Sequence, residues 1–289
     1  GRMRYIARFY RYILRERKNY DTVFVHMNPE YVVLAGVLWR LLGKRVALWY
    51  THKSVTWWLR AAVHLTHLVY TASTESFRVP SEKVVVVGHG IDISTYTLTP
   101  YTERTRDSVC MVGRIAPVKR QLFGVDVLDE LHRRGRLARL HIYGATVTSA
   151  DELYLQEIED TITIKKFGTH VSLEGAVSQD DLPSVLGRTQ VMLHLSDTGS
   201  LDKVVLEALA CGLLVVSTSK AVHAVLPEKL QALQPTEDTP EAVAATLLRV
   251  LQLGREEYDT LAREGSAWVA SEHALPALIG RMVEGLGRR

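Results

Sequence analysis

The sequence predicts an α/β protein with two doubly wound domains, each built on a parallel sheet that helices cover. Short runs rich in β-branched residues alternate with longer amphipathic stretches, a pattern typical of parallel strands joined by helical crossovers. The alternation breaks once, in the polar, threonine-rich stretch 94–108, and then restarts. A chain of 289 residues, of which 47% are hydrophobic, is long enough to form two such domains.

The first domain is predicted to span residues 1–97. It opens on a basic stretch whose apolar residues recur at helical spacing, with no strand before it, so we expect an N-terminal helix and a domain that lacks its front. A second helix is expected from residue 29 to about 43. The predicted strands are 22–26, 45–50, 67–72 and 83–88.

The second domain is predicted to span residues 98–268 and to carry a full set of strands. The final segment, 269–289, is expected to form a helix that packs back on the first domain. The predicted strands are 109–113, 138–144, 170–175, 191–196 and 213–218. The predicted helices are 118–134, 149–167, 179–187, 203–210, 239–265 and 275–287.

The composition limits which binding partners and which cellular compartment we expect for this protein. The formal net charge of +3 is too small to indicate nucleic-acid binding. Cys110 and Cys211 lie far apart in apolar surroundings, which favours free thiols in a reducing compartment. No apolar run has the length of a membrane span. We therefore expect a cytoplasmic protein.

One candidate anion site follows the first strand of the second domain. Ligands of open parallel sheets bind outside the carboxyl ends of the strands. There, Gly113 permits close approach of the backbone, Arg114 offers a planar fork for phosphate oxygens, and Lys119 begins the next helix. The alternative is two solvated cations that flank a turn. The glycine fingerprints of nicotinamide and P-loop sites are absent from the sequence.

A second polar cluster lies at the start of helix 203–210. With Ser200 as its N-cap, the free amides of the first turn would face the carboxyl edge of the sheet. Glu207 would fall on the same face as Ser200 and be available to a ligand. Its alternative role is an i,i+4 ion pair with Lys203 on a solvated face.

Three motifs together resemble a known family. The segments "VGHGIDISTY", "VGRIAPVKRQ" and "GSLDKVVLEALACGLLVV" occur in this order, and the sequence is similar to the retaining, nucleotide-sugar-dependent glycosyltransferases of family 4 over roughly residues 20–265. The resemblance implies the GT-B architecture, in which two Rossmann-like domains face a cleft. It also implies a hexosyltransferase-type enzyme that uses a UDP or GDP sugar in polysaccharide or glycolipid synthesis.

The resemblance also assigns roles to residues. It implies that Arg114 and Lys119, beside Gly113, hold the donor diphosphate and that Glu207 hydrogen-bonds the ribose. His52, after the second strand, would reach the sugar and phosphate; the alternative is an ordinary strand-end histidine. The donor-sugar contacts would come from backbone amides of the turn formed by Gly199, Ser200, Leu201 and Asp202.

The sequence departs from the family at one acidic position. The family has two glutamates separated by seven residues, but Gly199 stands where the first would precede Glu207. Asp202 or Asp197 would have to substitute for it. We expect no metal and no cofactor apart from the nucleoside diphosphate sugar, which is a co-substrate.

The acceptor is expected to be a glycan, a lipid-linked molecule or a small molecule. The basic N-terminal helix would allow peripheral contact with the inner face of a membrane; alternatively its apolar side packs on its own sheet. Two other functions remain open. One is a sugar-nucleotide-binding module without turnover, and the other is a nucleotide-sugar epimerase or sugar phosphorylase on the same fold.

Overall fold

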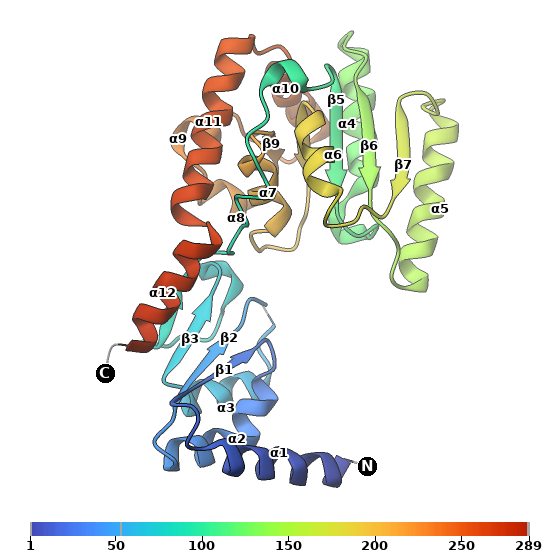
Figure 1. Ribbon diagram of the computed structural model, residues 1–289. Coiled ribbons are helices and arrows are strands. Elements are labelled where there is room, and N and C mark those ends of the chain that lie inside the picture. Colours follow the sequence, from blue (N-terminus) through green and yellow to red (C-terminus); the bar gives the residue numbers. More distant parts are fainter. Residues whose placement is uncertain (1, 53, 288–289) are drawn as a thin grey trace. The chain divides into compact units, whose positions relative to one another are not determined.

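The chain forms two compact units in the computed structural model, which describes residues 2–52 and 54–287 (Figure 1). Unit 1 comprises the residues up to His89 and those from Pro276 onward, and unit 2 comprises Gly90–Leu275. The division precedes the polar stretch 94–108 because Ile91 bridges to Ala274 and Tyr96 packs in the core of unit 2. Each unit contains one all-parallel sheet, so the predicted α/β fold class is confirmed.

Unit 1 is a four-stranded sheet in the order β1-β2-β3-β4. Its strands match the four predicted runs to within two residues at either end, because each run is apolar and β-branched. The strands are β1 (Thr22–His26), β2 (Arg45–Trp49), β3 (Leu68–Thr71) and β4 (Val84–Val86). The helices are α1 (Arg2–Glu16), α2 (Pro29–Leu41), α3 (Trp57–Leu65), the short turn η1 (Thr74–Ser76) and α12 (Leu275–Gly287).

The helices of unit 1 bury only part of their apolar surface. In α1, Phe9, Tyr10 and Ile13 pack with Trp39 in the core of the unit, which is the packing that the helical spacing predicts. Other apolar side chains of α1 stay exposed. The C-terminal helix α12 also packs on this sheet, where the Tyr70 hydroxyl donates to the carbonyl of Met282 at 2.7 Å.

Unit 2 is a five-stranded sheet in the order β7-β6-β5-β8-β9. The chain runs outward from β5 to β7 and then crosses back to β8, so the topological switch point lies between β5 and β8. In sheets of this kind the ligand crevice opens there, outside the carboxyl ends of the strands. The strands are β5 (Ser108–Val112), β6 (Arg139–Tyr143), β7 (Val171–Gly175), β8 (Val191–His194) and β9 (Leu214–Ser217).

Helices cover the sheet of unit 2 in two groups. The reversal of direction at the switch point puts right-handed crossovers on opposite faces. In one group α4 contacts both α5 and α10, and in the other α7 contacts both α6 and α11. The helices are α4 (Gln121–Arg133), α5 (Ser149–Ile164), α6 (Leu182–Arg188), α7 (Lys203–Ala210), α8 (Lys220–His223), α9 (Glu228–Gln231), α10 (Pro240–Leu251) and α11 (Arg255–Glu272), with the short turns η2 (Tyr101–Glu103) and η3 (Pro117–Lys119).

The single helix predicted at 239–265 is wrong. The structure has α10 and α11 instead, because Gln252 ends the first helix and Gly254 takes an extended conformation with a ψ of 157° before the second. Cys110 and Cys211 are both free and buried, and burial raises the pKa of each thiol to about 12.

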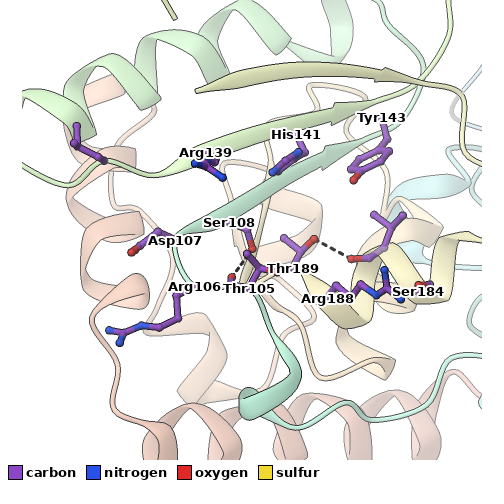
Figure 2. Close-up of a pocket in the computed structure, with 12 residues that line it drawn as sticks. Thr105, Arg106, Asp107, Ser108, Arg139, His141, Tyr143, Ser184, Arg188 and Thr189 are labelled. Carbon is purple, nitrogen blue, oxygen red and sulfur yellow. Dashed lines mark hydrogen bonds between the residues drawn. The ribbon is translucent and has the colours of Figure 1, made fainter. Parts of the chain in front are cut away.

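One part of the sheet in unit 2 is left open. Along β6, Leu140 and Ile142 are buried in the core, whereas Arg139, His141 and Tyr143 project from the other face, where Figure 2 shows them in a row. The alternation follows from the two-residue period of a strand.

Candidate functional site

The turn after β5 depends on two glycines. Gly113 adopts a φ of 148°, a conformation that L side chains rarely adopt. A Cβ added to Gly144 would lie 1.9 Å from the carbonyl oxygen of Gly113. The amide of Gly113 also donates to the carbonyl of Tyr143 at 3.0 Å. The backbone before Arg114 is therefore fixed against the end of β6.

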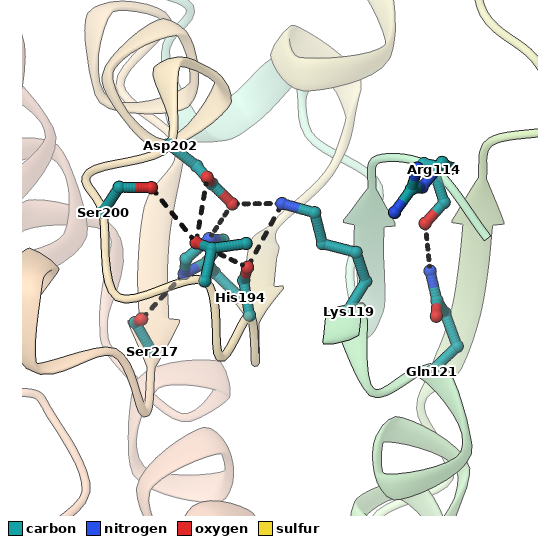
Figure 3. A network of polar contacts seen from close by, with 9 residues as sticks. Arg114, Lys119, Gln121, His194, Ser200, Asp202 and Ser217 are labelled. Carbon is teal, nitrogen blue, oxygen red and sulfur yellow. Dashed lines mark hydrogen bonds and ion pairs between the residues drawn. The ribbon is translucent and has the colours of Figure 1, made fainter. Parts of the chain in front are cut away.

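Arg114 is exposed at this turn and only loosely paired. Its nearest acidic partner is Asp151, with 3.9 Å between Nε and Oδ2. Its carbonyl oxygen accepts a hydrogen bond from Gln121 Nε2 at 3.0 Å, which anchors the backbone to the start of α4 (Figure 3). Most of the guanidinium donors therefore remain available to a ligand.

Lys119 reaches across from the turn after β5 to the turn after β8. Its ammonium donates to Ser196 Oγ at 3.1 Å and forms an ion pair with Asp202 Oδ2 (Figure 3). An ammonium has three N–H donors, so one is left for a ligand once these two contacts are made. The turn 113–119 and the polar cluster before helix 203–210, both identified from the sequence, therefore meet at this ion pair.

A buried histidine supports Asp202 from the other side. His194 Nε2 lies 3.0 Å from Asp202 Oδ2, and His194 Nδ1 lies 2.9 Å from Ser217 Oγ. Burial by itself would raise the pKa of Asp202, but the hydrogen bond and charge of His194, together with those of Lys119, hold this pKa well below its usual range. Asp202 is therefore ionised at neutral pH.

Glu207 is buried rather than solvated. It is 3% exposed, and its Oε1 lies 3.3 Å from Lys203 Nζ, so the i,i+4 pair considered from the sequence does form. The Tyr96 hydroxyl donates to Gln179 Oε1 at 3.4 Å, and burial together with the nearby Glu207 charge raises the pKa of Tyr96.

The predicted N-cap at Ser200 is wrong. Helix α7 begins at Lys203, with Asp202 at the N-cap position and without a side-chain cap, because the Asp202 carboxylate is turned toward Lys119 and His194. The Ser200 hydroxyl instead donates to Thr198 Oγ1 at 3.3 Å. The amides of the first helical turn belong to Lys203 and the residues after it.

One pocket of about 420 Å³ gathers most of the predicted donor site. The lining does not include the predicted residues Gly199, Ser200 and Leu201. Gly199 has a φ of 66°, and Leu201 is buried in the core of unit 2. The lining includes the predicted residues Gly113, Arg114, Lys119, Asp202 and Glu207, together with Gln179, Tyr143 and Lys203.

His52 lies elsewhere in the chain. It belongs to unit 1, in the loop after β2, where it is exposed and its Nδ1 accepts a hydrogen bond from the amide of Ser54 at 3.1 Å. Its role toward the donor stays a prediction.

Sequence reasoning missed His194, Ser217 and Tyr96. His194 did carry a signal, since it is the polar residue in the otherwise apolar strand run 191–195. Within residues 2–52 and 54–287, no group of three or more His, Cys, Asp or Glu side chains could hold a metal ion. No helix among these residues is long and apolar enough to cross a bilayer.

Topology and site together define a doubly wound α/β protein with a cation-lined pocket at its switch point. Residues 106–253 match the family described as "Glycosyl transferases group 1". This match covers just over half of the chain, and the chain belongs to that family. No curated protein matches the sequence.

Solved structures share the fold of the whole chain. HepE of Anabaena, crystallised with UDP and glucose, has a TM-score of 0.77 at 17% identity, over 97% of this chain and 80% of its own. A glycosyltransferase from Rickettsia africae has a TM-score of 0.77 at 14% identity, over 97% and 79%. Sucrose-phosphate synthase of Thermosynechococcus elongatus has a TM-score of 0.71 at 16% identity, over 97% and 76%. The GT-B fold predicted from the sequence is thereby confirmed.

Proposed function

We propose that this chain transfers a hexose from a nucleoside diphosphate sugar to an acceptor hydroxyl, with retention of the anomeric configuration. The observation that carries the proposal is the pocket in which Lys119, fixed by Asp202, lies with Arg114 and the buried Glu207. HepE, which shares the fold, was crystallised with UDP and glucose, and this supports a nucleotide-sugar donor. Retention rests on the family resemblance of the sequence motifs.

The cations of the pocket would stabilise the leaving diphosphate. As the bond between the sugar and the phosphate breaks, negative charge develops on the diphosphate, and preorganised donors lower the energy of that state by ~3 kcal/mol each. Arg114, the free N–H of Lys119 and the first amides of α7 are the donors in this proposal. They take the role that a metal ion has in other transferases, so we expect the reaction to need no metal.

Asp202 is assigned to Lys119 rather than to the sugar. Its Oδ2 is occupied by Lys119 and His194, and its Oδ1 lies 3.4 Å from Thr198 Oγ1. Asp197 is exposed, outside the pocket lining. Neither carboxylate stands in for the glutamate that the family has at position 199, and Glu207 is left to bind the ribose hydroxyls.

Three measurements test this proposal. Thermal shift with UDP, GDP and ADP sugars identifies the donor, because a ligand at 100 times its Kd stabilises a protein by ~2.7 kcal/mol. Release of free nucleoside diphosphate only in the presence of an acceptor separates a transferase from an epimerase. The anomeric configuration of the product, read by proton NMR, tests retention. Stabilisation by none of the three donors would contradict the donor site.

A sugar-nucleotide-binding module without turnover is the second candidate. Gly199 supplies no carboxylate at the position where the family has its first glutamate, and this favours the module. The decisive result would be donor binding by calorimetry without nucleotide release in any acceptor mixture. The His52→Ala variant adds a second test, because in the transferase proposal it lowers turnover more than donor affinity.

In this proposal the acceptor is a glycan, a lipid-linked molecule or a small molecule. Helix α1 would bring the chain to an anionic membrane, where lipid-linked acceptors lie. Tyr5, Ile6 and Leu14 are exposed on α1 beside Arg8 and Arg11, a combination typical of helices that lie in a membrane interface. Flotation with vesicles that contain phosphatidylglycerol tests this contact. The Arg8→Gln/Arg11→Gln variant should float less than the unmodified chain.

A further inference from the structure

Three arginines of unit 2 have no partner for their guanidinium groups. Within Gly90–Leu275, which the structure describes in full, every other arginine forms an ion pair or a hydrogen bond through its side chain. The exceptions are Arg106, Arg139 and Arg188. All three line one pocket of about 500 Å³.

This pocket lies on the open face of β6. Arg139, His141 and Tyr143 project from the strand, and Arg188 comes from the end of α6 across from them (Figure 2). Arg106 lies just before β5 and lines the same pocket, at the opposite end from Tyr143 (Figure 2). The polar lining also includes Asp107 and the hydroxyl residues Thr105, Ser108, Ser184 and Thr189.

Acidic groups near these arginines are already engaged. Asp107, which also lines the pocket, accepts a hydrogen bond from Arg136 Nε at 2.6 Å. Glu174, on the neighbouring strand, lies 2.8 Å from His141 Nδ1. Asp107 and Glu174 thus each have another partner, and neither forms an ion pair with Arg106, Arg139 or Arg188. An anion that enters the pocket would therefore meet three positive charges that are not paired with a carboxylate.

We propose that this pocket binds a small phosphorylated molecule through Arg139 and Arg188. A guanidinium presents parallel N–H donors that match the oxygens of a phosphate group, and these two come from opposite walls of the pocket. The volume of about 500 Å³ is within the usual range for a small-molecule site.

The site is distinct from the donor pocket. The two pockets share Tyr143 alone among their lining residues, and Arg114, Lys119 and Glu207 belong only to the donor pocket. The proposal therefore stands whether or not the chain transfers sugar.

Calorimetry with pyrophosphate tests the proposal once the donor pocket is disabled. In a chain that carries Arg114→Ala and Lys119→Ala, pyrophosphate at 0.15 M salt should still bind. Adding Arg139→Gln and Arg188→Gln should weaken this binding by about tenfold or more, the loss expected for charged hydrogen bonds. The matched control Arg263→Gln changes an exposed arginine of α11 and should leave the affinity unchanged.

Lysine variants separate specific recognition from general attraction. Arg139→Lys with Arg188→Lys keeps both charges but loses the planar forks, so pyrophosphate should bind less tightly than to the arginine pair. Circular dichroism checks that each variant is folded. Absence of binding in the donor-disabled chain, or equal affinity in the glutamine or lysine variants, would overturn the proposal.

Discussion

The ammonium of Lys119 and the carboxylate of Asp202 form an ion pair across the switch point of unit 2, between residues 83 positions apart in the sequence. Lys119 follows β5 and Asp202 follows β8, and these strands are neighbours in the sheet. The pair therefore holds the Lys119 ammonium in the pocket that Arg114 also lines. Asp202 in turn is held by His194, whose ring is backed by Ser217.

The first prediction concerns the stability that this pair contributes. Asp202→Asn keeps the shape of the side chain but removes its charge, so the free energy of unfolding at pH 7 should fall by ~1 to 3 kcal/mol. The folded pKa of Asp202 lies below its ordinary value of 3.8, so the stabilisation is complete above about pH 4 to 5 and disappears as pH falls through the folded pKa. The difference between variant and unmodified chain should therefore shrink below pH 4.

Urea unfolding at pH 7 and at pH 3 measures this difference. Asp197→Asn is the matched control, since Asp197 is exposed and five residues away; it should change the free energy of unfolding by less than ~0.5 kcal/mol. An equal loss in both variants, or a difference that grows at low pH, would show that the Lys119–Asp202 pair does not contribute to stability.

Arg114→Ala should weaken binding of the nucleoside diphosphate by ~1.5 to 3 kcal/mol, because it removes charged hydrogen bonds to phosphate oxygens. Isothermal titration calorimetry measures the affinity. As a control, Arg133→Ala removes an exposed arginine that pairs with Asp129 and Glu130 on α4, and it should leave the affinity alone. Unchanged affinity in folded Arg114→Ala would exclude Arg114 from the donor site.

Glu207→Gln should lower nucleotide affinity while leaving stability nearly unchanged, because glutamine keeps the shape of the side chain and its amide oxygen still accepts hydrogen bonds. Calorimetry and thermal unfolding of the same samples separate the two effects. In the unmodified chain, EDTA should change neither nucleotide binding nor turnover. Strict dependence on added Mg²⁺ or Mn²⁺ would show that the cations of the protein do not suffice for the leaving group.

Gly144→Ala should destabilise unit 2 by ~1 to 3 kcal/mol, as expected for a contact that the structure cannot accommodate without a shift. The added methyl would collide with the Gly113 carbonyl, at 1.9 Å, and displace the turn that carries Arg114. Gly168→Ala is the control, because nothing lies within 4 Å of its added Cβ. Thermal unfolding compares the two, and a Gly144→Ala midpoint no lower than that of Gly168→Ala would contradict the close approach.

The strands, most of the helices and the class of fold can be predicted from the sequence. All nine predicted strands are present, because runs such as 83–88 and 213–218 combine β-branched residues with flanking turns, and this is a local property. Helix 203–210 also begins and ends where the periodicity places it. The break between α10 and α11 was not predictable in this way, since the apolar spacing continues across Gln252 and Gly254.

The tertiary structure alone decided which polar residues act together. Nothing local in the sequence shows that Asp202 would turn toward Lys119 instead of capping its own helix, because that choice depends on β5 and β8 being neighbours. His194 became part of the site because its strand places the ring beside Asp202, and Arg139 and Arg188 line one pocket because α6 leaves the face of β6 open. Such contacts join residues far apart in the chain, so their partners are set by the order of the strands and not by sequence spacing.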